Sequence, residues 1–190
     1  MKDTDMRLLC IGDSNTYGYD PSSYFGGRYP ACVRWTDNLD GWEVVNCGMN
    51  GLSIPADGKV WRNLIESKNP NLITIMLGSN DLLEGRSAAA AAERMETFLK
   101  TILDNWKSVL LIAPPPMKPG AWVQSESQIR ESGRLCQLYR DQADKLGIDF
   151  ADAGDWNVEL SFDGVHFTEA GHEAFAEGLK NHLKEKYHES

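Results

Sequence analysis

The stretch Asn71-Leu-Ile-Thr-Ile-Met-Leu77 is apolar and β-branched over most of its length and lies between Pro70 and Gly78. A short apolar run bounded in this way predicts a strand that is buried on both faces, as in a parallel sheet covered by helices. Further short apolar runs occur on either side of it, at residues 7–12, 42–46, 108–113 and 147–151. Together these runs predict a sheet of five parallel strands.

Longer segments with apolar residues at helical spacing separate the runs, at residues 58–68, 88–106, 125–146 and 168–187. In the first segment we expect Val60, Leu64 and Ile65 on one buried face, and in the last we expect Thr168 as the N-cap. Strands that alternate with helices predict right-handed crossovers. The expected fold is therefore α/β, a three-layer α/β/α sandwich of the flavodoxin-like type, with residues 1–190 forming one domain.

Composition narrows the range of partners. The chain has 42% hydrophobic residues and a formal net charge of −9, so it can form a core, and it repels nucleic acid and anionic membrane surfaces. We find no apolar run of the ~18 residues that a membrane-spanning helix needs, and no signal peptide at the N-terminus. The four cysteines show no paired spacing, which favours reduced thiols and a cytoplasmic location.

A serine follows the first predicted strand, in Gly12-Asp13-Ser14-Asn15. A serine at a strand-to-helix turn exposes its hydroxyl near backbone N–H donors, which suits a nucleophile. The same residues are also common as simple helix caps. A nucleophilic role for Ser14 therefore needs a base elsewhere in the chain.

His166 is the best candidate for that base among the four histidines. Asp163 precedes it by three residues, so its carboxylate can hold the imidazole Nδ1–H and leave Nε2 to accept a proton from Ser14. His172 and His182 lie in the last predicted helix and His188 directly follows it, and we expect all three on a solvated surface.

An acyl-transfer site also needs donors for the oxyanion. Gly51 follows the second predicted strand and, lacking a Cβ, allows a ligand to approach its N–H closely. Asn80 follows the third predicted strand and carries a side-chain amide. Each residue alone is a common turn former. Because the carboxyl ends of parallel strands meet at one edge of a sheet, we expect Ser14, Gly51 and Asn80 to converge there.

These residues resemble, in order and spacing, the sequence blocks of the SGNH hydrolases, also called GDSL lipases and esterases. The resemblance rests on Gly12-Asp13-Ser14, Gly51, Asn80-Asp81 and Asp163-Gly-Val-His166, and extends from residue 7 to about residue 185. It implies the SGNH hydrolase fold and a catalytic triad of Ser14, Asp163 and His166. It also implies an oxyanion hole formed by the N–H groups of Ser14 and Gly51 and the amide of Asn80.

Other segments are similar to a bacterial arylesterase/acyltransferase branch of that family: Arg34-Trp35, Met76-Leu-Gly-Ser-Asn-Asp81, Ala113-Pro-Pro-Pro116, Asp152-Ala-Gly154 and Asp163-Gly-Val-His-Phe-Thr-Glu169. One residue departs from the family pattern, because Asn15 stands where the first block often has an apolar residue. Beside the nucleophile, Asn15 is a candidate for the substrate pocket.

The remaining candidates surround the predicted site. Asp13 is expected to support the turn by hydrogen bonding rather than to act as a second acid. Four aromatic residues either line a substrate pocket or pack in the core or at an oligomer contact: Tyr17, Tyr19, Trp35 and Trp122. They come from two loops, residues 17–38 and 117–124, whose tryptophans would permit a homo-oligomer.

The sequence thus predicts a serine esterase acting on short-chain acyl esters, acetyl or aryl, as its small-molecule substrates. We expect no cofactor, and the spacing of His, Cys and carboxylate residues predicts no metal site. A carbohydrate O-acetyl esterase or an acyltransferase with the same site is the alternative within enzymes. A non-catalytic flavodoxin-like binding module is the alternative of another class.

Overall fold

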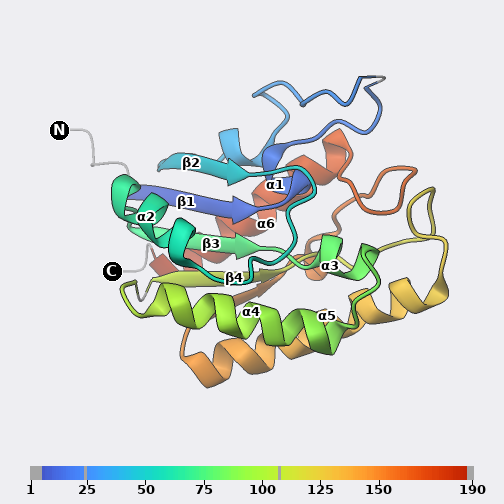
Figure 1. The fold of residues 1–190 in the computed structure, drawn as a ribbon. Helices are drawn as coiled ribbons and strands as arrows, with labels where there is room; N and C mark the ends of the chain where they lie inside the picture. The colour runs from blue at the N-terminus through green and yellow to red at the C-terminus, as the bar shows by residue number, and fades with distance from the viewer. Residues whose placement is uncertain (1–5, 24, 107, 188–190) are drawn as a thin grey trace.

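The computed structural model describes residues 6–23, 25–106 and 108–187. Five strands form one parallel sheet in the order β2-β1-β3-β4-β5 (Figure 1). They are β1 (Met6–Gly12), β2 (Trp42–Gly48), β3 (Leu72–Met76), β4 (Val109–Ala113) and β5 (Asp149–Asp152). The expected parallel sheet is confirmed, and its strands begin and end within one or two residues of the predicted runs.

Helices cover both faces of the sheet. One core joins the sheet to α2 (Lys59–Lys68), α4 (Ala88–Leu103) and α5 (Glu126–Leu146), and a second core joins its other face to α6 (Glu169–Tyr187). In Figure 1, α4 and α5 lie on one side of the strands and α6 passes behind them. The three-layer α/β/α sandwich predicted from the sequence is therefore confirmed.

Local capping explains where the long helices begin. The Ser87 side chain accepts a hydrogen bond from the N–H of Ala90 at the start of α4. Ser125 and Gln128 form a capping box at the start of α5. The Thr168 hydroxyl accepts from the N–H of Gly171 (3.0 Å), as expected for the N-cap of α6.

The predicted inner face of α2 is wrong at one residue. Val60 is 79% exposed, whereas Trp61 and Ile65 are buried. The Trp61 indole packs edge-on against Phe98 of α4, with ring centroids 6.3 Å apart. The helix is rotated so that its largest apolar side chain is buried, because an indole removes more apolar surface from water than an isopropyl group does.

The three neighbouring strands β2, β1 and β3 end level with one another. Gly12 at the end of β1 pairs in register with Gly48 of β2 and with Met76 of β3. The short helices α1 (Ser14–Tyr17) and α3 (Ser79–Leu83) begin just beyond this edge. Ser14, Gly51 and Asn80 therefore all leave the carboxyl edge of adjacent strands. Among the described helices, none is both long enough and apolar enough to cross a membrane.

The expected surface position of His172 is wrong. Its side chain is fully buried, edge-on to the rings of Tyr29 (5.2 Å) and Phe167 (5.4 Å). Its Nδ1 accepts a long hydrogen bond from the N–H of Trp35 (3.5 Å), and its Nε2 has no partner among the described residues. Burial, with a smaller effect from Arg34, lowers the pKa of His172 to about 4.

The expected surface position of His182 differs from the structure as well. His182 is partly buried, and its Nε2 lies 2.8 Å from Oδ2 of Asp149 in β5. His188 lies outside the described residues. The side of this helix that packs on the sheet is apolar and contains Phe175, Leu179 and Leu183.

We expect stability to fall on acidification because of His172. In the unfolded chain the imidazole binds a proton near pH 6.5, whereas buried His172 stays neutral until about pH 4. Protons therefore stabilise the unfolded state between these values, and the free energy of unfolding should drop by about 2 kcal/mol from pH 7 to pH 5 on account of this residue. Urea titrations of the wild type and of His172→Phe measure it.

The His172→Phe variant keeps an aromatic ring between Tyr29 and Phe167 but cannot bind a proton. Other titrating groups contribute equally to both proteins, so the difference between the two pH slopes isolates the imidazole. Equal losses of stability in both proteins would show that His172 is not the cause.

Candidate active site

Ser14 is the first residue of α1 and is 6% exposed. Asp13 is the N-cap, and its Oδ1 accepts a hydrogen bond from the N–H of Asn15 (3.0 Å). Burial raises the pKa of Asp13 to about 6, although the bond from Asn15 opposes the shift. The expected supporting role of Asp13 in this turn agrees with these contacts.

The structure brings Ser14, His166 and Asp163 into one hydrogen-bonded line. Ser14 Oγ lies 2.9 Å from His166 Nε2, and His166 Nδ1 lies 2.7 Å from Asp163 Oδ2. An ionised carboxylate can only accept, so the ring N–H is on Nδ1, and Nε2 is free to accept from the serine hydroxyl. Residues separated by more than 150 positions in sequence thus share a proton path.

Asp163 is held in its charged form. Burial alone would raise its pKa, but hydrogen bonds from the His166 ring and from the N–H groups of His166 and Val165 outweigh burial, and the pKa of Asp163 lies below its ordinary value. Both backbone bonds reach Oδ1 at 2.9 Å. The carboxylate therefore orients the imidazole and also fixes the turn that carries it.

Two aromatic rings flank the imidazole. Tyr19 and Trp122 lie with their ring centroids 4.6 and 4.8 Å from that of His166, and Trp122 is half exposed. The two rings cover much of His166, which is only 2% exposed. The outer part of the Trp122 ring remains accessible to a substrate.

The loop of residues 117–124 is tied to the turn that carries His166. The N–H groups of Lys118 and Trp122 donate to the carbonyl oxygens of Gly164 (3.0 Å) and Asp163 (3.1 Å). The two backbones are so close that a Cβ at Gly164, where φ is +85°, would lie 2.1 Å from the Lys118 oxygen. Glycine is therefore required there by both space and conformation.

Asn80 is hydrogen-bonded to the loop that carries Gly51, at the next residue, Leu52. Asn80 Nδ2 donates to the carbonyl oxygen of Leu52 (3.1 Å), which leaves its second amide hydrogen for another acceptor. Gly51 has φ +72°. Among the described residues, the N–H groups of Gly51 and Ser14 donate to no acceptor. The N–H groups of Ser14 and Gly51 and one amide hydrogen of Asn80 are thus not used within the described part of the chain.

A sequence model of the GDSL-like lipase/acylhydrolase family matches residues 10–174. The chain belongs to this family. It is therefore an ester hydrolase, and not the non-catalytic binding module that its fold alone would also allow. The resemblance inferred from the short sequence blocks is confirmed.

Solved structures agree with this assignment. The M. smegmatis aryl esterase is 26% identical and superposes with a TM-score of 0.83, over 95% of this chain and 99% of its own. A carbohydrate acetylesterase family member from Sinorhizobium meliloti is 27% identical, with a TM-score of 0.82 over 95% and 98%. A lipolytic G-D-S-L family member from Veillonella parvula DSM 2008, 17% identical with a TM-score of 0.74 over 97% and 100%, shares the fold. The comparison with curated proteins gave no significant match.

Two residues expected in the substrate pocket of this GDSL-family hydrolase are in its interior. Asn15 is 3% exposed, and both polar atoms of its side chain bond to backbone near His166. Trp35 is 1% exposed, packs on Phe175 (4.7 Å between ring centroids) and donates its indole N–H to the carbonyl of Asn15 (3.0 Å). For Trp35 the core-packing alternative is therefore the correct one.

Tyr17 is at the end of α1, and its ring lies under the Arg28 guanidinium, 4.5 Å from the ring centroid. Of the four candidate aromatics, Tyr19 and Trp122 are thus the two that contact the imidazole. No group of three or more potential metal ligands was found within the described ranges.

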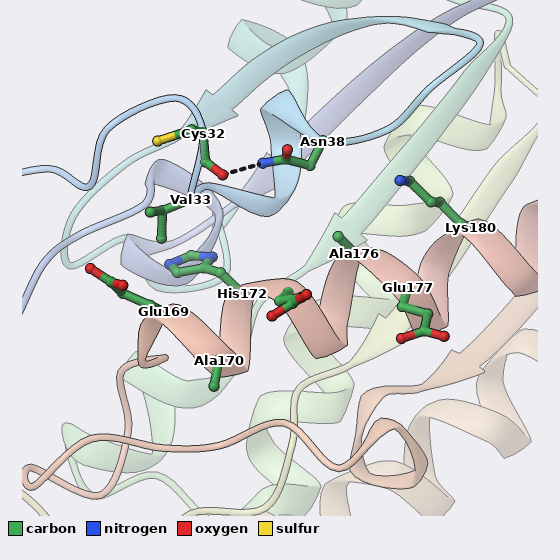
Figure 2. A pocket seen from close by; sticks show the side chains of 10 residues that line it. Cys32, Val33, Asn38, Glu169, Ala170, His172, Ala176, Glu177 and Lys180 are labelled. Carbon is green, nitrogen blue, oxygen red and sulfur yellow. Dashed lines mark hydrogen bonds between the residues drawn. The ribbon is translucent and has the colours of Figure 1, made fainter.

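A cavity of about 740 Å³ lies away from this site, between residues 32–38 and α6 (Figure 2). His172 is at its inner wall, and Glu169, Glu173 and Glu177 are among the residues that line it. Neither Ser14 nor His166 lines it. Its size therefore says nothing about the room available for an acyl group.

Asp81, which stands out in the sequence only as part of a motif, holds the loop that carries Gly51. Its side chain is fully buried, and Oδ2 accepts from the N–H of Ile54 (2.8 Å) while Oδ1 lies 3.2 Å from Arg94 Nε. Arg94 in turn donates to the Ile54 carbonyl. Burial raises the pKa of Asp81, opposed by the Ile54 and Arg94 contacts. The Asn80-Asp81 pair thus binds residues 52–54 at two points.

Replacing Asp81 by alanine should therefore be costly. Asp81→Ala leaves the Ile54 N–H without its acceptor and Arg94 without its counter-charge, and we expect the free energy of unfolding to fall by about 2–3 kcal/mol at neutral pH. Urea unfolding measures the loss. The matched control is Glu84→Ala, which removes an exposed carboxylate paired with Arg86 and should change stability much less. Similar losses in the two variants would contradict the anchoring role of Asp81.

Proposed function

We propose that this GDSL-family hydrolase cleaves short-chain acyl esters with Ser14 as nucleophile, His166 as general base and acid, and Asp163 as the group that orients the imidazole. The observation that carries the proposal is the 2.9 Å contact between Ser14 Oγ and His166 Nε2, continued by the 2.7 Å contact between Nδ1 and Asp163. This arrangement of nucleophile, base and orienting carboxylate is the one that acyl transfer by serine requires.

The reaction proceeds in two acyl transfers. Ser14 Oγ attacks the ester carbonyl while Nε2 of His166 takes the hydroxyl proton, and Asp163 stabilises the imidazolium that forms. His166 then gives this proton to the leaving alkoxide oxygen, which releases the alcohol and leaves an acyl-Ser14 ester. Water, deprotonated by His166 in the same way, attacks the acyl group, and the proton returns to Ser14 as the acid departs.

The negative charge on the carbonyl oxygen needs donors at each tetrahedral stage. We assign this role to the N–H groups of Ser14 and Gly51 and the free amide hydrogen of Asn80. The register of β1 with β2 and β3 supports the assignment, because the three donors follow strand ends that lie side by side. Each donor of this kind is worth roughly 3 kcal/mol of barrier.

The surroundings of Ser14 favour a small acyl group attached to a ring-bearing alcohol. Ser14 is 6% exposed, and Tyr19 and Trp122 lie against His166, so access to the nucleophile is narrow for a long chain. The half-exposed Trp122 indole offers a flat surface on which an aryl or sugar ring can stack. Both an aryl esterase and a carbohydrate acetylesterase are among the similar structures, and they support acetyl esters of either kind.

Removing the nucleophile tests the chemical proposal. Ser14→Ala should abolish turnover of p-nitrophenyl acetate, and an organophosphonate probe that labels the wild type stoichiometrically should no longer react. Asp163→Asn should retain the fold and lose about three to four orders of magnitude in kcat, because the amide favours the wrong imidazole tautomer. Steady-state kinetics and peptide mapping of the labelled protein provide the measurements.

Ser79 supplies the matched control, since it is also a buried serine at the start of a short helix beyond a strand end. Ser79→Ala should still be labelled at Ser14. Label on a residue other than Ser14, or turnover by folded Ser14→Ala above the uncatalysed rate, would refute the assignment of the nucleophile.

Substrate preference separates the related activities. We expect kcat/KM to fall at least tenfold from acetate to octanoate p-nitrophenyl esters, since Ser14 is only 6% exposed and the rings of Tyr19 and Trp122 lie against His166. Trp122→Ala should raise KM for aryl acetates and leave the acyl-length preference unchanged. Faster deacetylation of acetylated sugars than of aryl acetates would favour the carbohydrate O-acetyl esterase, and ester products in the presence of added alcohols would favour acyl transfer. A preference for octanoate would contradict the short-chain proposal.

The four cysteines are free, and Cys10 is fully buried. Burial raises the pKa of the Cys10 thiol to about 12, so it is inert as a nucleophile. Free thiols support the proposal that the protein works in a reducing, cytoplasmic environment.

A further inference from the structure

The side chain of Asn15 joins the two halves of the candidate site. Its Nδ2 donates to the carbonyl oxygen of Val165 (3.1 Å), and its Oδ1 accepts from the N–H of Phe167 (3.0 Å). Val165 and Phe167 are the residues on either side of His166, and Asn15 directly follows Ser14. One amide group therefore links the neighbour of the nucleophile to both neighbours of the base.

Asn15 is itself fixed in place from two sides. Its backbone N–H donates to Asp13 Oδ1 (3.0 Å), and its carbonyl accepts from the indole N–H of Trp35 (3.0 Å). Trp35 is 1% exposed and packs on Phe175 of α6. The side-chain amide thus extends from a backbone that is held in place. A displacement of the His166 turn relative to α1 would have to break two buried hydrogen bonds.

The two bonds require the chemistry of an amide. One partner is a carbonyl oxygen, which needs a donor, and the other is an N–H, which needs an acceptor. Leucine has a similar size and shape but can supply neither, and an aspartate carboxylate can supply only the acceptor. Asn15 is 3% exposed, so water cannot replace either bond without the turn moving.

We propose that Asn15 is a positioning residue that sets the distance between Ser14 Oγ and His166 Nε2 by holding the backbone on both sides of His166. The inference rests on the proposed function of Ser14 and His166 and adds a residue to it. Asn15 does not touch the substrate. It acts on the geometry of proton transfer, where a misplacement of about 1 Å can cost two orders of magnitude in rate.

The Asn15→Leu variant tests this role. We expect kcat for p-nitrophenyl acetate and the rate of organophosphonate labelling at Ser14 to fall together, by about tenfold to a hundredfold. We expect KM to stay within twofold, because the side chain is buried. The downfield proton resonance of the His166 Nδ1–H should remain, since its bond to Asp163 lies within one turn of the chain.

Gln142→Met is the matched control for a general loss of stability. Gln142 is also a buried amide that donates to a backbone carbonyl, that of Ala92 (2.6 Å), but it joins α5 to α4. Its kcat should remain within twofold of the wild type even if its melting temperature falls as far as that of Asn15→Leu. Asn15→Asp, which keeps the size and the acceptor, covers the case in which Asn15→Leu does not fold, and its kcat at pH 8 should fall at least fivefold with KM unchanged.

The outcomes separate the inference from the proposed function. A wild type that is neither active nor labelled at Ser14 would overturn the proposed function and the inference with it. An active wild type together with folded Asn15 variants whose kcat lies within twofold of it would overturn the inference alone. The inference would also fail if the downfield resonance disappeared, or if Gln142→Met lost as much activity, because Asn15 would then serve only the fold.

Discussion

The parallel pairing of β1 with both β2 and β3 is the constraint on which the candidate site depends. Because these strands end in register at Gly12, Gly48 and Met76, the segments that follow them leave the sheet at one edge. Ser14 follows β1, the middle strand of these three, and Gly51 and Asn80 follow its two neighbours. A shift of register in either pairing would carry one donor away from the serine, so the burial of the strands fixes the geometry of the site.

Burial then makes the polar groups of the site depend on one another. Ser14, Asp163 and His166 are at most 6% exposed, so each needs a partner inside the protein. Asp163 accepts three hydrogen bonds from Val165 and His166, and the Asn15 amide satisfies two backbone groups beside the same histidine. Because these groups are buried, water cannot replace their partners. The hydrogen-bond network therefore has few other arrangements of similar energy.

Those features that short segments determine could be predicted from the sequence. The strands of the sheet were visible as apolar runs, and Ser14, Gly51 and Asn80 could be placed together because they follow strand ends. The Asp163–His166 contact was predictable because it is local, over three residues. The residues that were misjudged are those whose surroundings come from distant parts of the chain: Val60, whose helix turns Trp61 inwards, and Asn15 and His172, which are buried. Trp35, for which the sequence left core packing and a pocket position open, contacts both of these residues in the interior.

The sequence by itself thus determined the α/β class, the parallel sheet, the family blocks and the candidates for the reacting groups, since these depend on local composition and on spacing along the chain. The tertiary structure alone decided that Oγ of Ser14 and Nε2 of His166 lie 2.9 Å apart, that the Trp122 ring lies against the His166 imidazole, and that the Asn15 side chain bonds to the protein interior. The physical reason is that hydrogen bonds and ring contacts between remote segments depend on sub-ångström packing of the whole core, which no local pattern of residues records.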